Sequence, residues 1–558
     1  MYTFDTSKSV RFLKLWYAAL TYASLVLVHT STTQGAFTQS VAKFALKSDQ
    51  SLKDLSLRQV TVYSSWLRRL GRCVLNILFI SSEVADIIKT GGLADVAKAL
   101  PAQLKSNGHQ VRVVMPCYSL IKGVENFPVI GSSSLNPGTD RQIDYTIRST
   151  HIANDVEVWL IDCPRYYNRT SIYGDNNQAY WDNGERYAFL SAASFDAAEK
   201  LQFRPDIVHA NDWHAALAPM ILRIKYDDNK FFDKTRSVIT VHNGAFQGVF
   251  DRGQIYMIPE ICQVYNDMIS QGTYINFLKC GVFYADKITT VSPGYAAELT
   301  TYLGGHGMTV NFQSRSADLV GIINGCDYSD WDPATDKHLK IQYDINTLEE
   351  KILGKYLLQK ELGLPMGDDP MYGMVARLTD QKGVGILIPI LEQFLRHRVQ
   401  IVIEGTGDPN LARQIQEIAD RHPDKMIFRS VYDNALAHKI EAAADFFLMP
   451  SIFEPCGLNQ MYSLAYGTIP IVRGVGGLRD TVTNYDTDQV NGNGFIFWDP
   501  NPEELLSTLR RSLILYLEDP VEMERLRKNA MSVHFSWEES CAKYEKLYEE
   551  ALTKPKWW

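Results

Sequence analysis

The chain has 558 residues, a length that exceeds one ordinary hydrophobic core and predicts two large domains. Apolar residues make up 46 % of the sequence, as in ordinary globular proteins. The formal net charge of −8 argues against a nucleic-acid partner, so an anion-binding site would have to be built from local groups.

The first 73 residues form a segment of their own. Basic residues followed by an apolar run, RFLKLWYAALTYASLVLVHT, have about the length of a signal peptide and are too short and too polar at their edges to predict a membrane span. Two interpretations stay open. One is a cleaved export signal; the other is upstream sequence translated from a wrongly chosen start. Because no methionine lies between Met1 and Met115, the second interpretation places a valine start codon at Val74.

From Val74 onward, short apolar runs alternate with helical patterns, which is typical of parallel strands buried on both faces. Helices are expected, for example, at NGERYAFLSAASFDAAEKL and INFLKCGVFYA. The strand-like runs of this first series are VLNILFISS, VRVVMP, VEVWLIDC, DIVHAND, SVITVHNG, KITTVSP and VGIINGCD.

A second alternating series follows a polar, helix-forming segment. Its strand-like runs are MYGMVARL, VQIVIEGTG, KMIFRSVY, DFFLMPS, TIPIVRG and GNGFIFW, with helices at DPNLARQIQEIADRH and NALAHKIEAAA. The expected fold class is therefore α/β, with two doubly wound, Rossmann-like domains whose strand ends face a cleft. We divide the chain into an extension at 1–73, a first domain at 74–330, a linker at 331–369, a second domain at 370–535 and a final helix at 536–558.

Several common site motifs are absent from the sequence. The eight cysteines are scattered, with no CxxC or Cys/His cluster of zinc spacing, so we expect reduced thiols as in the cytoplasm. Neither HExxH, GxSxG nor GxxxxGK[ST] occurs, which disfavours zinc proteases, serine hydrolases and P-loop ATPases.

Lys89, Gly91 and Gly92 occupy a strand-to-helix turn, in EVADIIKTGGLADVAKALP. Adjacent glycines allow a tight bend and a close approach of a ligand, and the following helix directs its positive end at that ligand. A phosphate site and a tight turn with a solvated lysine both remain open here.

Further polar clusters follow other strands. Arg377 and Lys382, in MVARLTDQKG, combine a guanidinium fork with a point charge and suit a diphosphate, although a solvated surface turn is the alternative. Glu454 precedes Pro455 and is therefore expected to be extended, with a helix starting near Gly457. A ligand with both hydroxyls and phosphate, such as a sugar nucleotide, suits this cluster; the alternative is a helix-capping carboxylate.

Two histidine clusters follow consecutive strands. HANDWHAAL contains Asp212 and His214, and VHNGAFQG contains His242 and Asn243. A lone histidine is usually a satisfied structural group. Two clusters at neighbouring strand ends make a functional site and a structural role about equally reasonable.

Four motifs, taken together and in order, resemble the glycogen and starch synthase family over residues 74–558: KTGGLADV, VHNGAFQG, ARLTDQKG and FEPCGLNQ…YGTIPIVRGVGGLRDTV. The resemblance implies a retaining glucosyltransferase of the double-Rossmann, GT-B type. It would transfer glucose from ADP-glucose to the non-reducing end of an α-1,4-glucan such as glycogen, without a metal or other cofactor. It also implies a final helix that crosses back to the first domain, and a cytoplasmic enzyme without stable membrane association. The cytosolic substrate favours the wrong-start interpretation of residues 1–73.

The resemblance also assigns roles to matching positions. Catalysis would involve Glu454, His242, Arg377, Lys382 and Asp212. Substrate binding would involve Lys89, Gly91, Gly92, Asn243, Asn324, Tyr432, Cys456, Gly457, Leu458 and Asn459, with Tyr432 stacking on adenine. Glu454 would hold glucosyl hydroxyls rather than act as a nucleophile.

Alternatives remain within and outside the enzyme class. Tyr432 could stack on uracil as well as adenine, so a UDP-glucose-dependent enzyme of the same fold is one alternative. A glucan-binding homologue without activity is another, although all the charged residues named above are present. A phosphorylase is disfavoured because no lysine for pyridoxal phosphate can be placed. The oligomeric state stays open.

Overall fold

The computed structural model describes residues 74–136, 142–175 and 178–555. The signal-like or wrongly started segment at 1–73 lies outside the described residues. Among the described residues, no helix is long and apolar enough to cross a bilayer.

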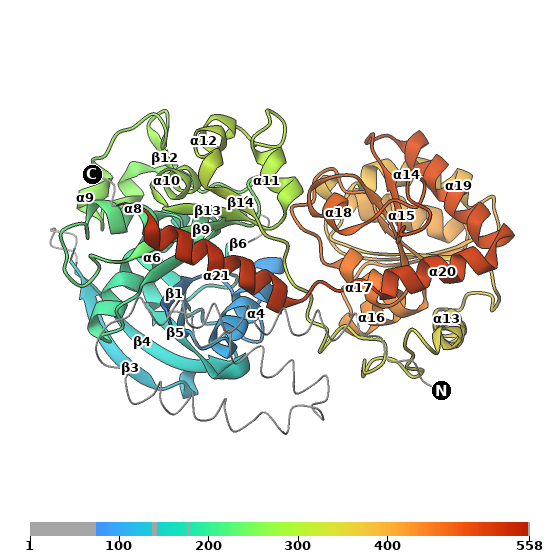
Figure 1. Ribbon diagram of the computed structural model, residues 1–558, viewed down its shortest axis with the longest axis horizontal. Helices are drawn as coiled ribbons and strands as arrows, with labels where there is room; N and C mark the ends of the chain where they lie inside the picture. The colour runs from blue at the N-terminus through green and yellow to red at the C-terminus, as the bar shows by residue number, and fades with distance from the viewer. Residues whose placement is uncertain (1–73, 137–141, 176–177, 556–558) are drawn as a thin grey trace, which may run out of the picture. The chain divides into compact units, whose positions relative to one another are not determined.

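The first half of residues 74–558 is built on a nine-stranded sheet with the order β14-β13-β9-β8-β1-β2-β5-β4-β3 (Figure 1). Its strands from β14 to β5 are parallel, while β4 and β3 run antiparallel at one edge. The strands are β1 (Asn76–Ile80), β2 (Gln110–Pro116), β3 (Val129–Leu135), β4 (Ile143–Ile152), β5 (Val156–Asp162), β8 (Ile207–Asn211), β9 (Arg236–Val241), β13 (Lys287–Thr290) and β14 (Leu319–Gly321).

Helices and short strands connect and cover this sheet. The α-helices are α4 (Gly92–Ser106), α5 (Pro164–Tyr167), α6 (Asn183–Lys200), α7 (Asp212–Ala215), α8 (Leu217–Ile224), α9 (Pro259–Cys262), α10 (Phe277–Tyr284), α11 (Pro293–Leu299) and α12 (Thr309–Ser314). The 3-10 turns are η2 (Val124–Asn126), η3 (Ala153–Asp155), η4 (Arg252–Ile255) and η5 (Ser316–Asp318). Two small sheets comprise β6 (Gly174–Asp175) with β7 (Gln178–Ala179), and β10 (Val249–Asp251) with β11 (Ser270–Gln271) and β12 (Tyr274–Asn276).

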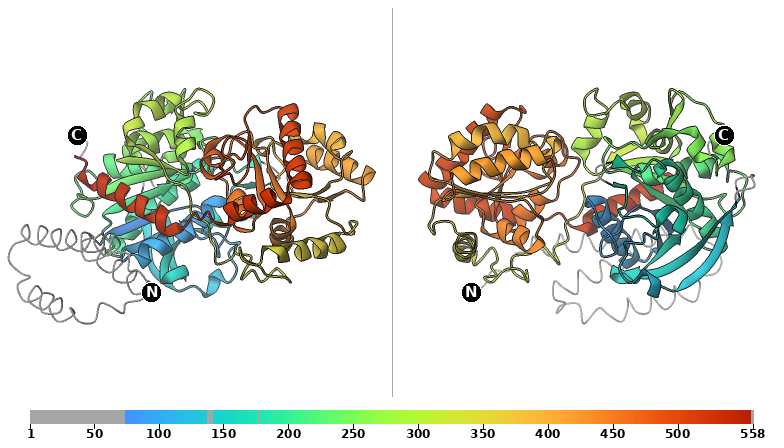
Figure 2. Two further views of the ribbon diagram at one scale, coloured as in Figure 1. Left: turned by 45° about the vertical axis from the view of Figure 1, so that its right-hand side comes forward. Right: turned by 180° about the vertical axis from the view of Figure 1, so that it is seen from behind.

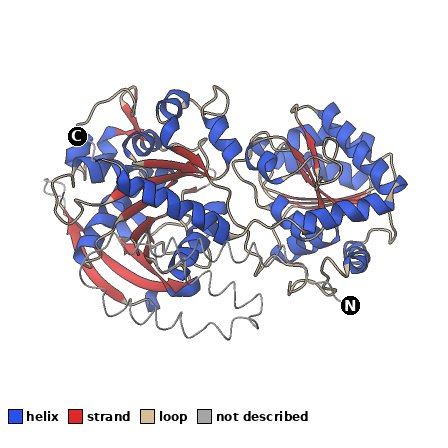
Figure 3. Cartoon of the chain, viewed as in Figure 1, coloured by secondary structure: helices blue, strands red, loops and turns tan. Residues whose placement is uncertain are grey.

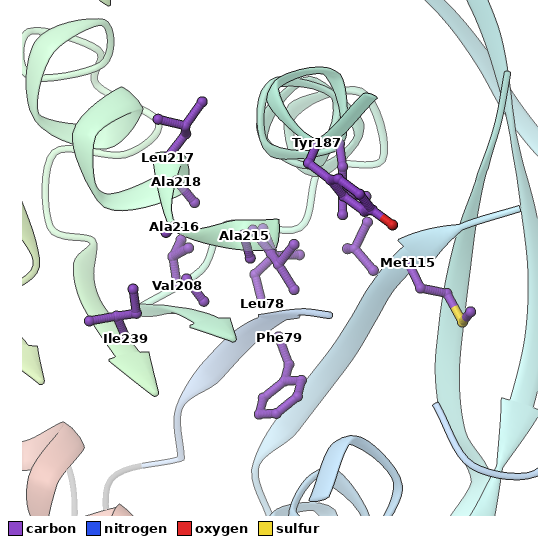
Figure 4. Close-up of a cluster of buried hydrophobic side chains, with 14 of the residues drawn as sticks. Leu78, Phe79, Met115, Tyr187, Val208, Ala215, Ala216, Leu217, Ala218 and Ile239 are labelled. Carbon is purple, nitrogen blue, oxygen red and sulfur yellow. The ribbon is translucent and has the colours of Figure 1, made fainter. Parts of the chain in front are cut away.

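The core of the first half explains why its strands are continuous apolar runs. Leu78 and Phe79 of β1 lie in the cluster that Figure 4 shows, with Val208 of β8 and Ile239 of β9, and all four side chains are fully buried. Strands buried on both faces cannot alternate apolar and polar residues.

The second half is an entirely parallel six-stranded sheet with the order β17-β16-β15-β18-β19-β20, and Figure 3 shows helices on either side of it. The strands are β15 (Met371–Val375), β16 (Gln400–Glu404), β17 (Met426–Arg429), β18 (Phe446–Met449), β19 (Ile469–Arg473) and β20 (Phe495–Phe497). The helices are η6 (Leu348–Glu350), α13 (Lys351–Leu362), η7 (Asp380–Lys382), α14 (Val384–Phe394), α15 (Pro409–Arg421), α16 (Asn434–Ala443), α17 (Asn459–Ala465), α18 (Gly476–Thr481), α19 (Pro502–Glu518) and α20 (Pro520–Met531).

The final helix, α21 (Trp537–Thr553), packs on α4 and β9 of the first half (Figures 1 and 2). Its Tyr548 hydroxyl lies 2.7 Å from Nδ1 of the buried His209, and Glu545 accepts a hydrogen bond from Asn107. The end of the chain is therefore attached to the first sheet by polar contacts as well as by packing.

The predicted fold class is confirmed, since the structure contains two doubly wound α/β halves. Every run predicted as a strand overlaps one, although VGIINGCD shares only its first two residues with β14, and the sequence did not indicate the antiparallel edge formed by β3 and β4. The serine-rich β3, VIGSSSL, has no apolar run and none of its residues is buried, because it lies at an exposed edge.

Candidate active site

The turn between β1 and α4 is organised by Glu83, a buried carboxylate that follows β1. It accepts hydrogen bonds from the main-chain N–H groups of Thr90, at 2.5 Å, and Gly91, at 3.2 Å. The Tyr173 hydroxyl donates to the same carboxylate at 2.5 Å. Glu83 therefore fixes the main chain of the glycine turn through hydrogen bonds to its N–H groups.

Lys89 lies on this turn with 52 % of its side chain exposed and pairs with Asp95, 2.7 Å away in the first turn of α4. The cation predicted for a phosphate thus already has an acidic neighbour. Burial raises the pKa of Asp95, and Lys89 opposes that shift. Gly91 caps α4, and a methyl group built on Gly92 would lie 4.0 Å from Leu458 of the second half.

Asp212 joins two strand ends of the first sheet. Its backbone is left-handed, with φ of 53°, and its side chain is buried. Oδ1 accepts from the main-chain N–H of His242 at 2.7 Å and of Asn243 at 3.3 Å. Burial raises the pKa of Asp212 to about 7, and these two hydrogen bonds oppose the shift.

His242 is oriented by Asn211, the last residue of β8. Its Nε2 lies 3.0 Å from Asn211 Oδ1, and burial lowers its pKa to about 3, so the imidazole is neutral at physiological pH. His214 is different, because its ring packs on Trp213 and Tyr187 and burial holds its pKa far below the usual range. The His214 ring is therefore held by packing, and its Nδ1 is buried without a hydrogen-bond partner among the described residues.

In the second half, Lys382 and Glu454 form an ion pair. Lys382 Nζ lies 2.6 Å from Glu454 Oε2, which also accepts from Ser451 Oγ at 3.0 Å. Glu454 is buried, and Lys382 is largely so. Arg377 is exposed and makes no hydrogen bond or ion pair with any other residue that the structure describes. Of the two bases Arg377 and Lys382, Arg377 is therefore the one without an anionic partner among the described residues.

The segment after Glu454 differs in detail from the prediction. The helix expected near Gly457 is α17, which begins at Asn459 and has Leu458 as its N-cap, without a side-chain cap. This excludes the capping role considered for Glu454. No described residue accepts a hydrogen bond from the main-chain N–H groups of Gly457, Leu458 or Asn459, so three donors remain open here.

The neighbouring side chains complete this segment. Cys456 is buried, which raises the pKa of its thiol to about 12, so it is a neutral thiol. Asn324 is buried with Oδ1 unpartnered among the described residues. Asn459 Nδ2 lies 3.4 Å from the carbonyl of Val375. Tyr432, after β17, is 63 % exposed and donates to Asn434 Oδ1, leaving its ring face accessible.

Gly476 was part of a quoted motif but was not predicted as a site residue. Its φ is 42°, and a Cβ atom there would lie 2.1 Å from the carbonyl oxygen of Glu454. The next residue, Gly477, donates its N–H to that carbonyl at 3.1 Å. The glycine pair therefore allows α18 to approach and fix the backbone of Glu454.

Hydrogen bonds join the two halves beside this segment. Ser292 Oγ donates to the carbonyl of Pro455 at 2.6 Å, and the Gly476 N–H donates to Glu298 at 2.7 Å. The strand-end residues of both sheets are thus brought near one another.

Sequence reasoning missed four residues that organise the site: Glu83, Asn211, Ser292 and Gly476. Each follows or ends a strand, or lies in a quoted motif. That location was the only feature of the sequence that could have indicated a role in the site. Their roles depend on long-range hydrogen bonds that no local pattern shows.

Within the described residues, no group of three or more His, Cys, Asp or Glu side chains could hold a metal.

Two Rossmann-like halves that present cations, a buried carboxylate and open main-chain donors at their strand ends define a glycosyltransferase of the GT-B type. Residues 76–313 match the starch synthase catalytic domain, and residues 359–533 match glycosyl transferases group 1. The chain therefore belongs to the glycogen and starch synthase family, and it is a glucosyltransferase.

Individual relatives agree with this assignment. The glycogen synthase of Aeromonas hydrophila subsp. hydrophila is 53 % identical over 482 residues, 86 % of this chain and 99 % of the relative. That of Vibrio parahaemolyticus is 49 % identical over 483 residues, with the same shares. The catalytic domain of starch synthase IV from Arabidopsis thaliana, bound to ADP and acarbose, superimposes with a TM-score of 0.76 at 31 % identity, covering 86 % of this chain and all of that one.

Proposed function

We propose that this enzyme transfers glucose from ADP-glucose to the non-reducing 4-hydroxyl end of an α-1,4-glucan, with retention of configuration. The observation that carries the proposal is the group formed by Arg377, Lys382 and Glu454 beside open main-chain donors. Glycogen synthases at about half identity, and the Arabidopsis starch synthase bound to ADP and acarbose, support the donor and the acceptor.

The two cations stabilise the negative charge that develops when the bond between glucose and the nucleoside diphosphate breaks. When the glucosyl–phosphate bond breaks, negative charge accumulates on the leaving nucleoside diphosphate. Arg377 pairs with no anion among the residues that the structure describes and is therefore available to the diphosphate. Lys382 shares its charge with Glu454, so it binds the diphosphate while orienting the carboxylate.

Glu454 and the open N–H groups suit the glucosyl hydroxyls. A carboxylate accepts hydrogen bonds from hydroxyls, and N–H groups donate to hydroxyl or phosphate oxygens. Because its position is fixed by Lys382, Ser451 and the glycine pair at Gly476, Glu454 is pre-organised to hold the sugar.

Retention usually requires a carboxylate nucleophile. The three buried carboxylates described at this site are already engaged: Glu454 by Lys382, Asp212 by the N–H groups of His242 and Asn243, and Glu83 by the glycine turn and Tyr173. We therefore propose attack on the same face of the sugar from which the nucleoside diphosphate departs, with a phosphate oxygen taking the acceptor's proton.

We propose that the reaction requires no metal ion, since Arg377 and Lys382 supply the positive charge that a metal would otherwise provide. Activity should survive dialysis against EDTA, and a loss that Mg²⁺ restores would contradict this. The substrates named also make a cytoplasmic location our proposal for the active enzyme.

One experiment tests the glucan end that is extended, the linkage that is formed and the configuration of the new bond. Glycogen is elongated with glucose-labelled ADP-glucose and then digested with β-amylase, which cleaves only α-1,4 bonds from the non-reducing end. The proposal expects nearly all the label to be released as maltose. Label that resists digestion would contradict the proposed linkage or configuration.

A further inference from the structure

His242 is joined to two other strand ends through one buried amide. The Asn211 side chain is fully buried at the end of β8. Its Nδ2 donates to the carbonyl of Ile80, the last residue of β1, at 3.0 Å, and its Oδ1 lies 3.0 Å from Nε2 of His242, just after β9. One side chain thus links the ends of β1, β8 and β9.

The chemistry of these groups fixes the position of the imidazole proton. A carbonyl oxygen only accepts hydrogen bonds, so the amide nitrogen of Asn211 must face Ile80. The amide oxygen must then face His242, and an oxygen acceptor requires that Nε2 carry the proton. No described residue makes a hydrogen bond to Nδ1 of His242, so that nitrogen keeps its lone pair.

We propose that Asn211 is a positioning residue that fixes His242 as the neutral tautomer protonated on Nε2, with Nδ1 left as a hydrogen-bond acceptor toward the sugar. The inference deepens the proposed function, because it rests on His242 lying beside the reacting sugar. Asn211 touches no substrate and acts only through His242.

Two further contacts restrict the imidazole. Asp212 holds the main chain of His242 at 2.7 Å, so the backbone and the ring are anchored separately on consecutive residues of the β8–α7 turn. Burial lowers the pKa of His242 to about 3, and the neighbouring His209 also has a pKa lowered to about 3, so neither ring adds a positive charge at neutral pH. A neutral ring has one donor and one acceptor nitrogen. Asn211 makes Nε2 the donor and leaves Nδ1 as the acceptor.

The first test reads the tautomer in the unmodified full-length enzyme, without substrate. Protein labelled with ¹⁵N-histidine is compared with His242→Ala to assign the His242 signals. A pyrrole-type Nε2 and a pyridine-type Nδ1 are expected. A protonated Nδ1 in the wild-type enzyme would overturn the proposal, whatever the enzyme's activity.

The second test removes the amide. In Asn211→Leu, the His242 signals should show a mixture of tautomers, and kcat should fall about 10- to 100-fold through misplacement of the ring, with KM for ADP-glucose changed less than about threefold. In a His242→Ala background, Asn211→Leu should cause no further loss of kcat, because its effect passes through that ring. An equal loss in both backgrounds would overturn the proposal.

A matched control separates positioning from folding. Asn311 is also buried, and its Nδ2 donates to the carbonyl of Met268 at 2.7 Å. Asn311→Leu removes a comparable hydrogen bond and should lower the melting temperature without changing kcat or the His242 signals. If the wild-type enzyme transferred no glucose at all, the proposed function would fail. The tautomer measurement would still show whether Asn211 fixes the proton on Nε2 of His242.

Discussion

The ammonium nitrogen of Lys382 lies 2.6 Å from Oε2 of Glu454, a carboxylate 72 residues further along the chain. This contact joins the turn after β15 to the segment after β18. The two motifs therefore form one charged unit. In the proposed mechanism, the cation that binds the leaving group and the carboxylate that holds the sugar therefore fix each other's position.

Glu454→Gln should lower kcat by about 100- to 1,000-fold, because it removes a pre-organised charge while keeping the side chain's size. The melting temperature should change by only a few degrees, since Lys382 remains partly hydrated. Steady-state kinetics and thermal denaturation measure the two effects. Glu392→Gln, which breaks an exposed pair with Arg421, is the control and should leave kcat unchanged. Wild-type turnover in Glu454→Gln would refute the role of Glu454.

Tyr432→Ala should raise KM for the nucleotide donor about tenfold, because loss of a ring that stacks on a base costs roughly 1–3 kcal/mol. KM for glycogen should stay the same. Tyr432→Phe should behave like wild type, since only the exposed bond to Asn434 is lost. Tyr302→Ala, at another exposed tyrosine, controls for surface effects. A donor KM unaffected by Tyr432→Ala would show that this ring does not bind the base.

Gly476→Ala should reduce kcat about 100-fold, because the added methyl group displaces the backbone of Glu454, and misplacement of about 1 Å has that effect. Gly354→Ala is the matched control. It lies in α13 with open space around it, so it should leave kcat unchanged and stabilise the fold by about 0.4–1 kcal/mol. The prediction fails if the two variants have the same kcat.

Asp212→Asn should alter how stability depends on pH. The pKa of Asp212 is raised from 3.8 to about 7 on folding, so its contribution is present in full below about pH 4 and is lost as pH rises toward about 7. Relative to wild type, the asparagine variant should therefore gain stability as pH rises, by about 2 kcal/mol between pH 5 and pH 7. Urea unfolding at several pH values measures the difference. A constant difference would mean that the native carboxyl does not titrate as stated.

Much of the fold followed from sequence because buried parallel strands are short apolar runs ended by polar turns. This pattern indicated β1, β8 and β9 as readily as the strands of the second half. It did not indicate β3, whose serines lie at an exposed edge where no apolar run is needed. The start of α17 was misplaced by two residues because Gly457 precedes an uncapped turn.

The candidate site was only partly accessible to sequence reasoning. Lys382 and Glu454 were each named, but their mutual ion pair depends on the arrangement of β15 and β18 in the sheet. Lys89 was named without its partner Asp95. Glu83 and Asn211 were not named, because a buried polar residue with a hydrogen-bonding role looks the same in sequence as a solvated one.

The measurement that tests the account most directly is glucose incorporation into glycogen from ADP-glucose and from UDP-glucose, side by side, with wild-type enzyme and Glu454→Gln. The account predicts strong incorporation from ADP-glucose, much less from UDP-glucose, and a large loss in the variant. A preference for UDP-glucose would contradict the proposed donor. No incorporation from either donor by folded enzyme would contradict the proposed transfer itself.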